Sequence, residues 1–164
     1  MRQKETTTHR APAHSAGNPS GSLGMFAAHG TLIPTSGFSR VELEAAKRIC
    51  RVMDEGERAR GDPHRRKSLF MVGSSTARRL ADLGHAGLEP IAEIAGSRAV
   101  FAHLAQENPD FGAARETAEA LGLKPSSVRD ALSEAVSFFH QHGKPDEASQ
   151  VWARGLRLLD EGKI

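Results

Sequence analysis

The sequence of 164 residues contains one cysteine, one tryptophan and no tyrosine. Because Cys50 has no possible partner in the chain, an intrachain disulfide is excluded, and the apolar spacing around it predicts a buried structural thiol. No stretch reaches the roughly 20 apolar residues of a membrane span, and the first residues lack the apolar core of a secretory signal. We therefore expect no membrane partner and a cytoplasmic location.

The sequence also lacks the common motifs of catalytic and cofactor sites. It has no Gly-x-x-x-x-Gly-Lys phosphate loop, no dinucleotide fingerprint and no Gly-x-Ser-x-Gly nucleophile elbow. The eight histidines are scattered, and the close pair His140 and His142 has no cysteines or carboxylate to complete a zinc site. We therefore expect no enzyme activity, no metal and no cofactor.

The charge balance sets few limits on partners. The formal net charge is +2 and the isoelectric point lies near 9.0. This mildly basic balance permits contact with nucleic acid but does not require it. Ala, Leu, Arg and Glu dominate the second half of the chain, and these residues favour helix.

The chain divides into a tail and one domain. Residues 1–38 are rich in Thr, Ser, Gly, Pro and His and hold few residues that could pack, which predicts a disordered tail. Residues 39–164 are expected to form a single all-α domain. Its first part covers residues 39–108, and its second part, residues 109–164, consists of helical hairpins.

Apolar residues recur at helical spacing after residue 38, and no segment alternates convincingly as a strand does. Capping residues, glycines and prolines divide this part of the chain into helices. The expected helices cover residues 39–58, 74–83, 111–121, 126–141 and 146–161, and a further helix from Pro90 is expected to continue as a buried segment up to Asn108 and Pro109, which stop it. The predicted fold class is all-α, a small multi-helix domain with a C-terminal half that is similar to a helix-turn-helix.

A compact basic cluster lies between the first two expected helices. It consists of Arg65, Arg66 and Lys67, and it follows Gly61 and Pro63, which are expected to break the helix. Such a cluster is typical of a loop that contacts phosphates. A solvated loop without a ligand has the same composition, so both interpretations stay open.

The stretch 116–135 has the residue pattern of a helix-turn-helix. That motif needs a small residue where its two helices touch, a glycine at the turn and a β-branched residue facing inward on the second helix. Ala118, Gly122 and Val128 occupy these three positions. An ordinary helical hairpin with glycine at its turn is the alternative.

If the stretch is a helix-turn-helix, polar residues at the start of its second helix point away from the body. In that position they read base edges and contact phosphates. The candidate DNA-binding residues there are Lys124, Ser126, Ser127 and Arg129, with Arg65, Arg66 and Lys67 as auxiliary phosphate contacts.

An internal similarity at an offset of 35 residues favours a different function. The matched pairs are Leu104 with Phe139, Ala113 with Ala148, Leu121 with Leu156, and Leu123 with Leu158. Residues 100–160 therefore resemble one or two degenerate tetratricopeptide repeats, which bind partner peptides. Phe138, Phe139 and Trp152 would then shape a groove for a protein partner, or they pack the last two helices together.

The middle of the chain carries a second resemblance. The relevant segments are Ala46-Lys-Arg-Ile49, Leu69-Phe-Met-Val-Gly73 and the spaced residues Leu88, Ile91, Ile94, Ala95, Ser97, Val100, His103 and Leu104. In order and spacing, residues 43–104 resemble FlhD, the small subunit of the bacterial flagellar master transcription regulator, with an insertion at 57–66. The tail and the region after Pro109 have no clear counterpart.

This resemblance implies an all-α dimerising subunit that acts with an FlhC-like partner, which would bring most DNA contacts and its own metal site. Phe70 falls at the family's functional Phe position, whereas Met71 replaces the neighbouring Arg and Ala102 replaces the intersubunit Cys. Judged by spacing alone, Phe70 is a core residue.

Two functions are therefore expected from the sequence. The first is a DNA-associated transcription regulator subunit that works in a homo-oligomer or with an FlhC-like partner. The second is a tetratricopeptide-like adaptor or chaperone that binds a protein partner.

Overall fold

The computed structural model describes residues 25–28 and 31–162, which form an all-α domain with one short hairpin. The α-helices are α1 (Arg40–Arg58), α2 (Pro63–Asp82), α3 (Glu89–Leu104), α4 (Phe111–Ala120), α5 (Pro125–Gln141) and α6 (Pro145–Asp160). A 3-10 helix, η1 (Ala86–Leu88), precedes α3, and strands β1 (Met25–Ala28) and β2 (Thr31–Pro34) form the hairpin. The predicted all-α, multi-helix fold is confirmed.

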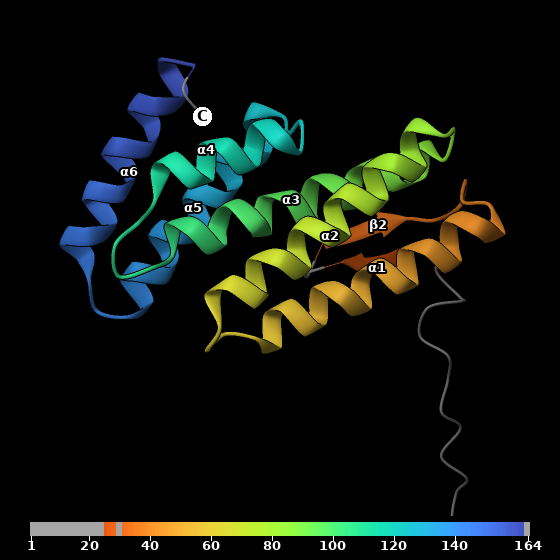
Figure 1. Cartoon of the computed structure of the whole chain (residues 1–164), viewed down its shortest axis with the longest axis horizontal. Coiled ribbons are helices and arrows are strands. Elements are labelled where there is room, and N and C mark those ends of the chain that lie inside the picture. Colours follow the sequence, from red (N-terminus) through yellow and green to blue (C-terminus); the bar gives the residue numbers. More distant parts are fainter. Residues whose placement is uncertain (1–24, 29–30, 163–164) are drawn as a thin grey trace, which may run out of the picture.

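Helix α3 is the centre of the molecule. Twelve of its sixteen residues are buried, so it has no polar face, as expected for a helix enclosed by others. Helix α2 packs against one side of α3, while α4 and α5 pack against the other (Figure 1). Helix α1 lies on α2, and α6 lies on α5.

Two apolar clusters share α3. The first cluster joins the early part of α3, including Ile91 and Ala95, to α1 and α2. The second joins the later part, including Val100 and Leu104, to α4, α5 and α6. Because both clusters use the same helix, the two halves of the domain are held in one fixed arrangement.

Helix α1 begins where the sequence predicts. The Ser39 backbone N–H donates to Glu42 Oε2 at 2.7 Å, and the Glu42 backbone N–H donates to Ser39 Oγ at 3.2 Å. This reciprocal pair is a capping box, which satisfies backbone donors at a helix start. The Gly87 backbone N–H also donates to Glu42 Oε1 at 3.2 Å, so the same carboxylate ties α1 to η1.

Helix α2 is much longer than predicted, because it begins at Pro63 and not at Ser74. Asp62 caps it by accepting from the Arg65 backbone N–H at 3.0 Å, and proline is compatible with the first helical turn. The basic cluster thus lies in a helical turn and not in a loop. Ser74 is fully buried, and its hydroxyl donates to the Ala92 carbonyl at 2.7 Å.

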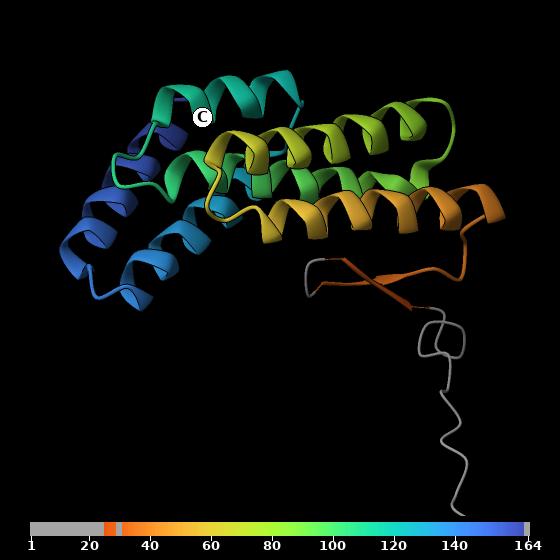
Figure 2. The same cartoon turned by 60° about the horizontal axis from the view of Figure 1, so that its bottom comes forward.

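The β1–β2 hairpin lies within the segment expected to be a disordered tail. Met25 pairs with Pro34 and Ala28 with Thr31 in an antiparallel register. Ile33 is 4% exposed and belongs to the first apolar cluster. Figure 2 shows the hairpin beneath α1, on the side away from α4. The prediction of a disordered tail is thus wrong for these strands. A strand of four residues is too short to show a clear alternation of apolar and polar residues in the sequence.

Candidate functional site

The corner between α4 and α5 is the candidate nucleic-acid interface. Gly122 has a φ of +59°, a backbone conformation that favours glycine. The Gly122 N–H donates to the Glu119 carbonyl at 3.1 Å, and the Leu123 N–H donates to the Ala118 carbonyl at 3.0 Å. These bonds end α4 tightly and turn the chain directly into α5.

The residues on the inner side of this corner are buried. Ala118 is 5% exposed and Val128 is 2% exposed, and both belong to the second apolar cluster. An ordinary helical hairpin would bury Ala118 and Val128 in the same way, so their burial does not distinguish it from a helix-turn-helix. The exposed side chains at the start of α5 therefore decide what the corner can bind.

Three of the four predicted reading residues are exposed at the start of α5: Lys124, Ser126 and Arg129. Ser127 is not, because it shares the helix face of Ala131 and Ala135 that packs against α3. Its hydroxyl donates to Glu93 Oε2 at 2.6 Å. Ser127 is therefore a structural contact between two helices, and its assignment to DNA reading is corrected.

Lys124 is exposed but paired. Its ammonium Nζ lies 2.7 Å from Glu89 Oε1 on α3, and its backbone N–H donates to Glu93 Oε2 at 3.2 Å. The hydrogen bond to Glu89 raises the pKa of Lys124 and lowers the pKa of Glu89. The positive charge of Lys124 is thus compensated by a carboxylate of the same domain.

Glu93 is the polar centre of this corner. Burial opposes its ionisation, but hydrogen bonds from Ser127, Arg78 and the Lys124 backbone outweigh that cost and lower the pKa of Glu93. Arg78 Nη2 lies 2.5 Å from Glu93 Oε1 and 3.5 Å from the Gly122 carbonyl. The end of α2 therefore lies beside the turn between α4 and α5.

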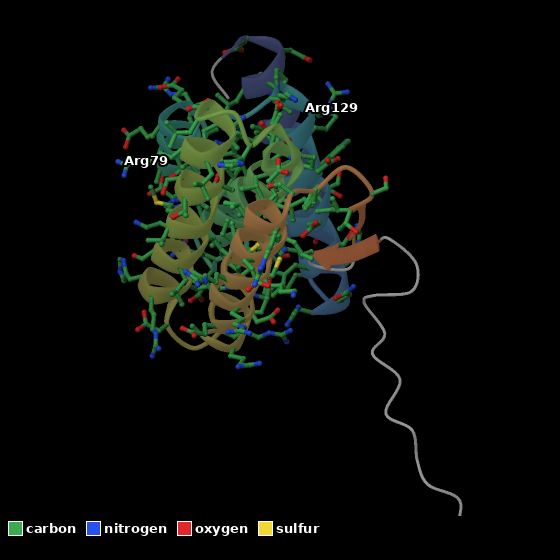
Figure 3. The ribbon with its side chains drawn as sticks, turned by 90° about the vertical axis from the view of Figure 1, so that its right-hand side faces the viewer. Arg79 and Arg129 are labelled. Carbon is green, nitrogen blue, oxygen red and sulfur yellow. The ribbon has the colours of Figure 1, made fainter. Side chains whose placement is uncertain are left out.

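This placement reveals a basic residue that the sequence did not single out. Arg79 follows Arg78, is exposed, and makes no ion pair within the described part of the chain. Arg129 is likewise exposed and unpaired among these residues. Figure 3 shows both side chains pointing outward, on opposite sides of the domain in this view. Arg79 and the turn are about forty residues apart, so no local pattern links them.

The basic cluster of α2 lies at the opposite end of α3. Arg66 Nη2 is 3.1 Å from Glu57 Oε2, and its Cζ is 5.2 Å from the centre of the Phe101 ring. Phe101 follows Glu89 by twelve residues on α3, which corresponds to about 18 Å along a helix. The structure therefore does not bring the α2 cluster and the start of α5 together.

Within that cluster, only Arg65 is fully exposed, and Lys67 is partly exposed. Arg66 has a side chain only 13% exposed and paired with Glu57. Burial lowers the pKa of Arg66 despite the Glu57 carboxylate. Arg66 is thus a structural residue, and its assignment as a phosphate contact is corrected.

The predicted partner-binding aromatics also separate into two groups. Phe70 is 0% exposed and Phe139 is 2% exposed, so neither offers a surface to a partner. Phe138 is partly buried, with its ring 6.2 Å from Phe101 and edge-on to it. Trp152 remains accessible, at 37% exposure.

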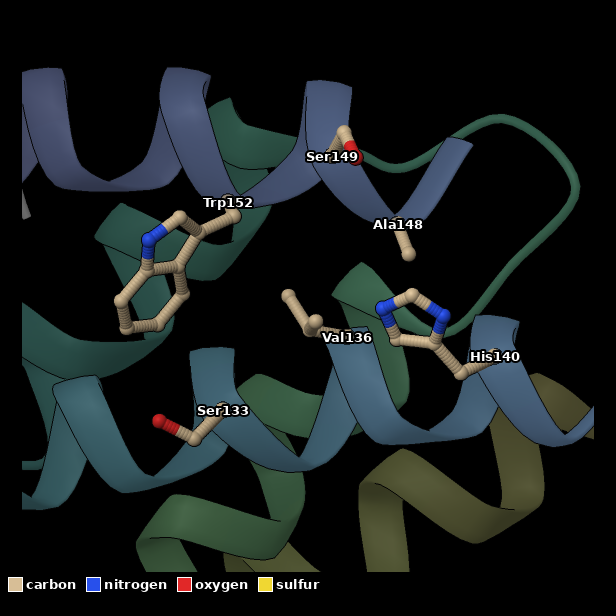
Figure 4. A pocket seen from close by; sticks show the side chains of 6 residues that line it. All are labelled: Ser133, Val136, His140, Ala148, Ser149 and Trp152. Carbon is tan, nitrogen blue, oxygen red and sulfur yellow. The ribbon is translucent and has the colours of Figure 1, made fainter. Parts of the chain in front are cut away.

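Trp152 lines a hollow of about 330 Å³ between α5 and α6. The other lining residues are Ser133, Val136, His140, Ala148 and Ser149. Figure 4 shows the indole at one end of the hollow and the His140 ring at the other, with Val136 between them. The tetratricopeptide-like interpretation places its partner surface in this region.

Among the described residues, no three His, Cys, Asp or Glu side chains come close enough to hold a metal ion. Burial, helped by Asp54, raises the pKa of Cys50 to about 11, which keeps this partly buried thiol protonated at neutral pH. None of the described helices is long and apolar enough to cross a bilayer.

Comparison with protein-family models, curated proteins and solved structures finds no match to this chain. The resemblances to FlhD and to tetratricopeptide repeats therefore stay predictions.

Proposed function

We propose that the chain is a subunit of a DNA-associated transcription regulator and that the start of α5 contacts the duplex. One observation carries this proposal: Val128 is buried while Ser126 and Arg129 are exposed at the first turns of α5. A recognition helix needs this division, because its inner face holds it on the domain and its first turns enter the major groove.

The side chains in this region have the chemistry for that role. Arg129 can donate two hydrogen bonds to a guanine edge or pair with a phosphate. Ser126 can bond to a base edge or to the sugar-phosphate backbone.

Carboxylates near the site restrict how a duplex can approach. Glu89 holds Lys124, and Asp130 is exposed next to Arg129. Contact with a phosphate would therefore require Lys124 to leave Glu89. Because the pair is exposed, this exchange is energetically small.

Arg129→Gln tests the proposal, with Arg157→Gln on α6 as a matched change of an exposed arginine. Binding to a labelled random duplex is measured by fluorescence anisotropy at several salt concentrations. If Arg129 contacts a phosphate, its loss weakens binding to every sequence and lowers the slope of log K against log salt by about 0.9. The Arg157 variant should behave like the native chain.

Two results would contradict the proposal. One is the absence of duplex binding by the native chain at low salt. The other is an equal affinity and salt slope for Arg129→Gln and Arg157→Gln.

The hollow between α5 and α6 favours a second candidate, an adaptor that binds a protein partner there. Trp152 is a large hydrophobic residue left exposed, and exposed aromatic residues beside a concavity are typical of interaction sites. Trp152→Ser should abolish co-purification of a defined partner, whereas Arg129→Gln should not. Co-purification that survives Trp152→Ser would exclude this hollow as the partner site.

A further inference from the structure

A second cavity lies where the end of α1, the start of α2 and the later parts of α3 and α5 meet. Its volume is about 670 Å³, within the usual range of small-molecule sites. Charged and aromatic side chains share its lining: Arg60, Arg66, Arg98, Glu57, Glu134, Phe101 and Phe138. We call this cavity the arginine pocket.

Arg98 is the centre of the arginine pocket and only 5% exposed. Its Nε donates to Glu57 Oε1 at 2.7 Å, and its Nη1 pairs with Glu134 Oε2. The other oxygen of Glu57 accepts from Arg66 at 3.1 Å. Two guanidinium groups therefore share the Glu57 carboxylate.

The arginine pocket has an excess of positive charge. Arg60 lies at its rim and makes no ion pair within the described residues. The three guanidinium groups of the lining outnumber its two carboxylates by one, and His142 also lines the cavity. A monovalent anion would balance this charge, whereas a divalent phosphate would reverse it.

Arg66 is incompletely satisfied. Its Nε is buried and has no hydrogen-bond partner among the described residues. Burial lowers the pKa of Arg66, and the positive charges of Arg98 and Arg60 lower it further, although Glu57 opposes them. An additional negative charge would relieve this mutual repulsion.

The aromatic side chains give the pocket apolar walls. The Arg98 guanidinium lies 4.2 Å from the centre of the Phe101 ring, and Phe138 stands edge-on to Phe101. Guanidinium groups recognise planar carboxylates through paired hydrogen bonds. Flat rings pack well against Phe side chains. The lining thus combines a carboxylate-binding part with a ring-binding part.

We propose that the arginine pocket binds a small organic monoanion with a carboxylate head and a flat apolar body. The carboxylate pairs with Arg60 at the rim, close to the largely buried guanidinium of Arg66, and the apolar body lies against Phe138. Glu134, whose side chain is 43% exposed, competes with the ligand for Arg98. The pocket lies at the end of α3 away from Lys124, so the proposal does not depend on DNA binding.

Benzoate is the probe, with benzylamine as a cation of the same shape. Binding to the full chain is followed by calorimetry and by NMR shifts of the Phe101 and Phe138 signals, at constant ionic strength. Benzoate should bind saturably and benzylamine should not. Arg60→Gln should weaken benzoate about tenfold, the usual effect of losing one charged hydrogen bond. Glu134→Gln should bind benzoate more tightly.

Arg79→Gln is the matched control, because Arg79 is an exposed arginine at the other end of α2. Its benzoate affinity should equal that of the native chain. The proposal is supported if Arg60→Gln loses affinity while Arg79→Gln keeps it. It is overturned if benzoate does not saturate, if benzylamine binds equally well, or if Arg60→Gln binds benzoate like the native chain.

Discussion

The contact between α3 and α5 has an ion pair at each end, and the two helices exchange the roles of cation and carboxylate between these ends. At the start of both helices, α3 provides the carboxylates Glu89 and Glu93. The cation there is Lys124, the residue directly before α5. Further along, α3 provides the cation Arg98 and α5 provides the carboxylate Glu134. The two helices run in the same direction, so a reversed α5 would bring like charges together. The charge pattern therefore helps to fix the direction of α5 on α3.

The two ends also differ in burial. The Lys124 and Glu89 side chains are 60% and 43% exposed, whereas the Arg98 side chain is 6% exposed. Exposed ion pairs contribute little to stability and exchange partners easily. Buried pairs are costly to break, because the remaining partner keeps an uncompensated charge. The start of α5 is thus suited to exchanging an internal partner for a ligand, and its later part to anchoring the helix.

The largest effect is expected at the buried end. Arg98→Met should lower the free energy of unfolding by about 3 kcal/mol, because Glu57 and Glu134 lose their shared cation. The contacts of Arg98 with the Phe70 and Phe101 rings are lost as well. Urea unfolding followed by circular dichroism measures the change. Arg157→Met, at an exposed position of α6, should change the stability by less than about 0.5 kcal/mol, and equal effects of the two variants would refute the contrast.

A smaller effect on the free energy of unfolding is expected when acid protonates the side chains near the two ends of α3. His103, near the end of α3, lies 3.0 Å from Thr117 Oγ1. Burial, and secondly Lys67, lower the pKa of His103 from its ordinary value of 6.5. The unfolded chain therefore binds this proton more readily than the folded chain, and stability falls as the pH drops below that value.

The carboxylates at the other end respond at lower pH. The lowered pKa values of Glu89 and Glu93 stabilise the fold above their ordinary value of 4.5, and this contribution is lost on further acidification. The free energy of unfolding should thus fall in two stages. His103→Gln should remove the first stage and leave the second. A native chain whose stability stays constant between about pH 7 and pH 5 would contradict the placement of His103.

The smallest effect is expected at the exposed end. Lys124→Gln should lower the free energy of unfolding only slightly, and the difference should vanish in high salt. Thermal melts at low and high salt compare this variant with the native chain. A loss as large as that of Arg98→Met would show that the two ends do not differ as described.

Local signals in the sequence predicted much of the fold. The capping box of Ser39 and Glu42 marks the start of α1, and Gly122 and Gly143 mark turns that the structure confirms. The bounds of α4, α5 and α6 agree with the prediction to within one residue. In α2, however, the predicted start at residue 74 lies inside the helix, and the Ser74 hydroxyl makes a contact with α3.

The polar contacts of the candidate site could not be predicted in the same way. Ser127 is held by Glu93, which lies 34 residues earlier in the sequence. Arg98 has partners 41 and 36 residues away, and the sequence around it shows only an apolar segment. Such contacts depend on how helices pack, so neither spacing nor composition reveals them.

The most direct test of the account is an NMR titration of the isotope-labelled chain with a short duplex at low salt. We expect the largest amide shifts on Ser126 and Arg129, whereas the amide signals of Trp152 and Ser149 should stay unchanged. Shifts confined to the hollow between α5 and α6, or no shifts at all, would contradict the claim that the start of α5 faces DNA.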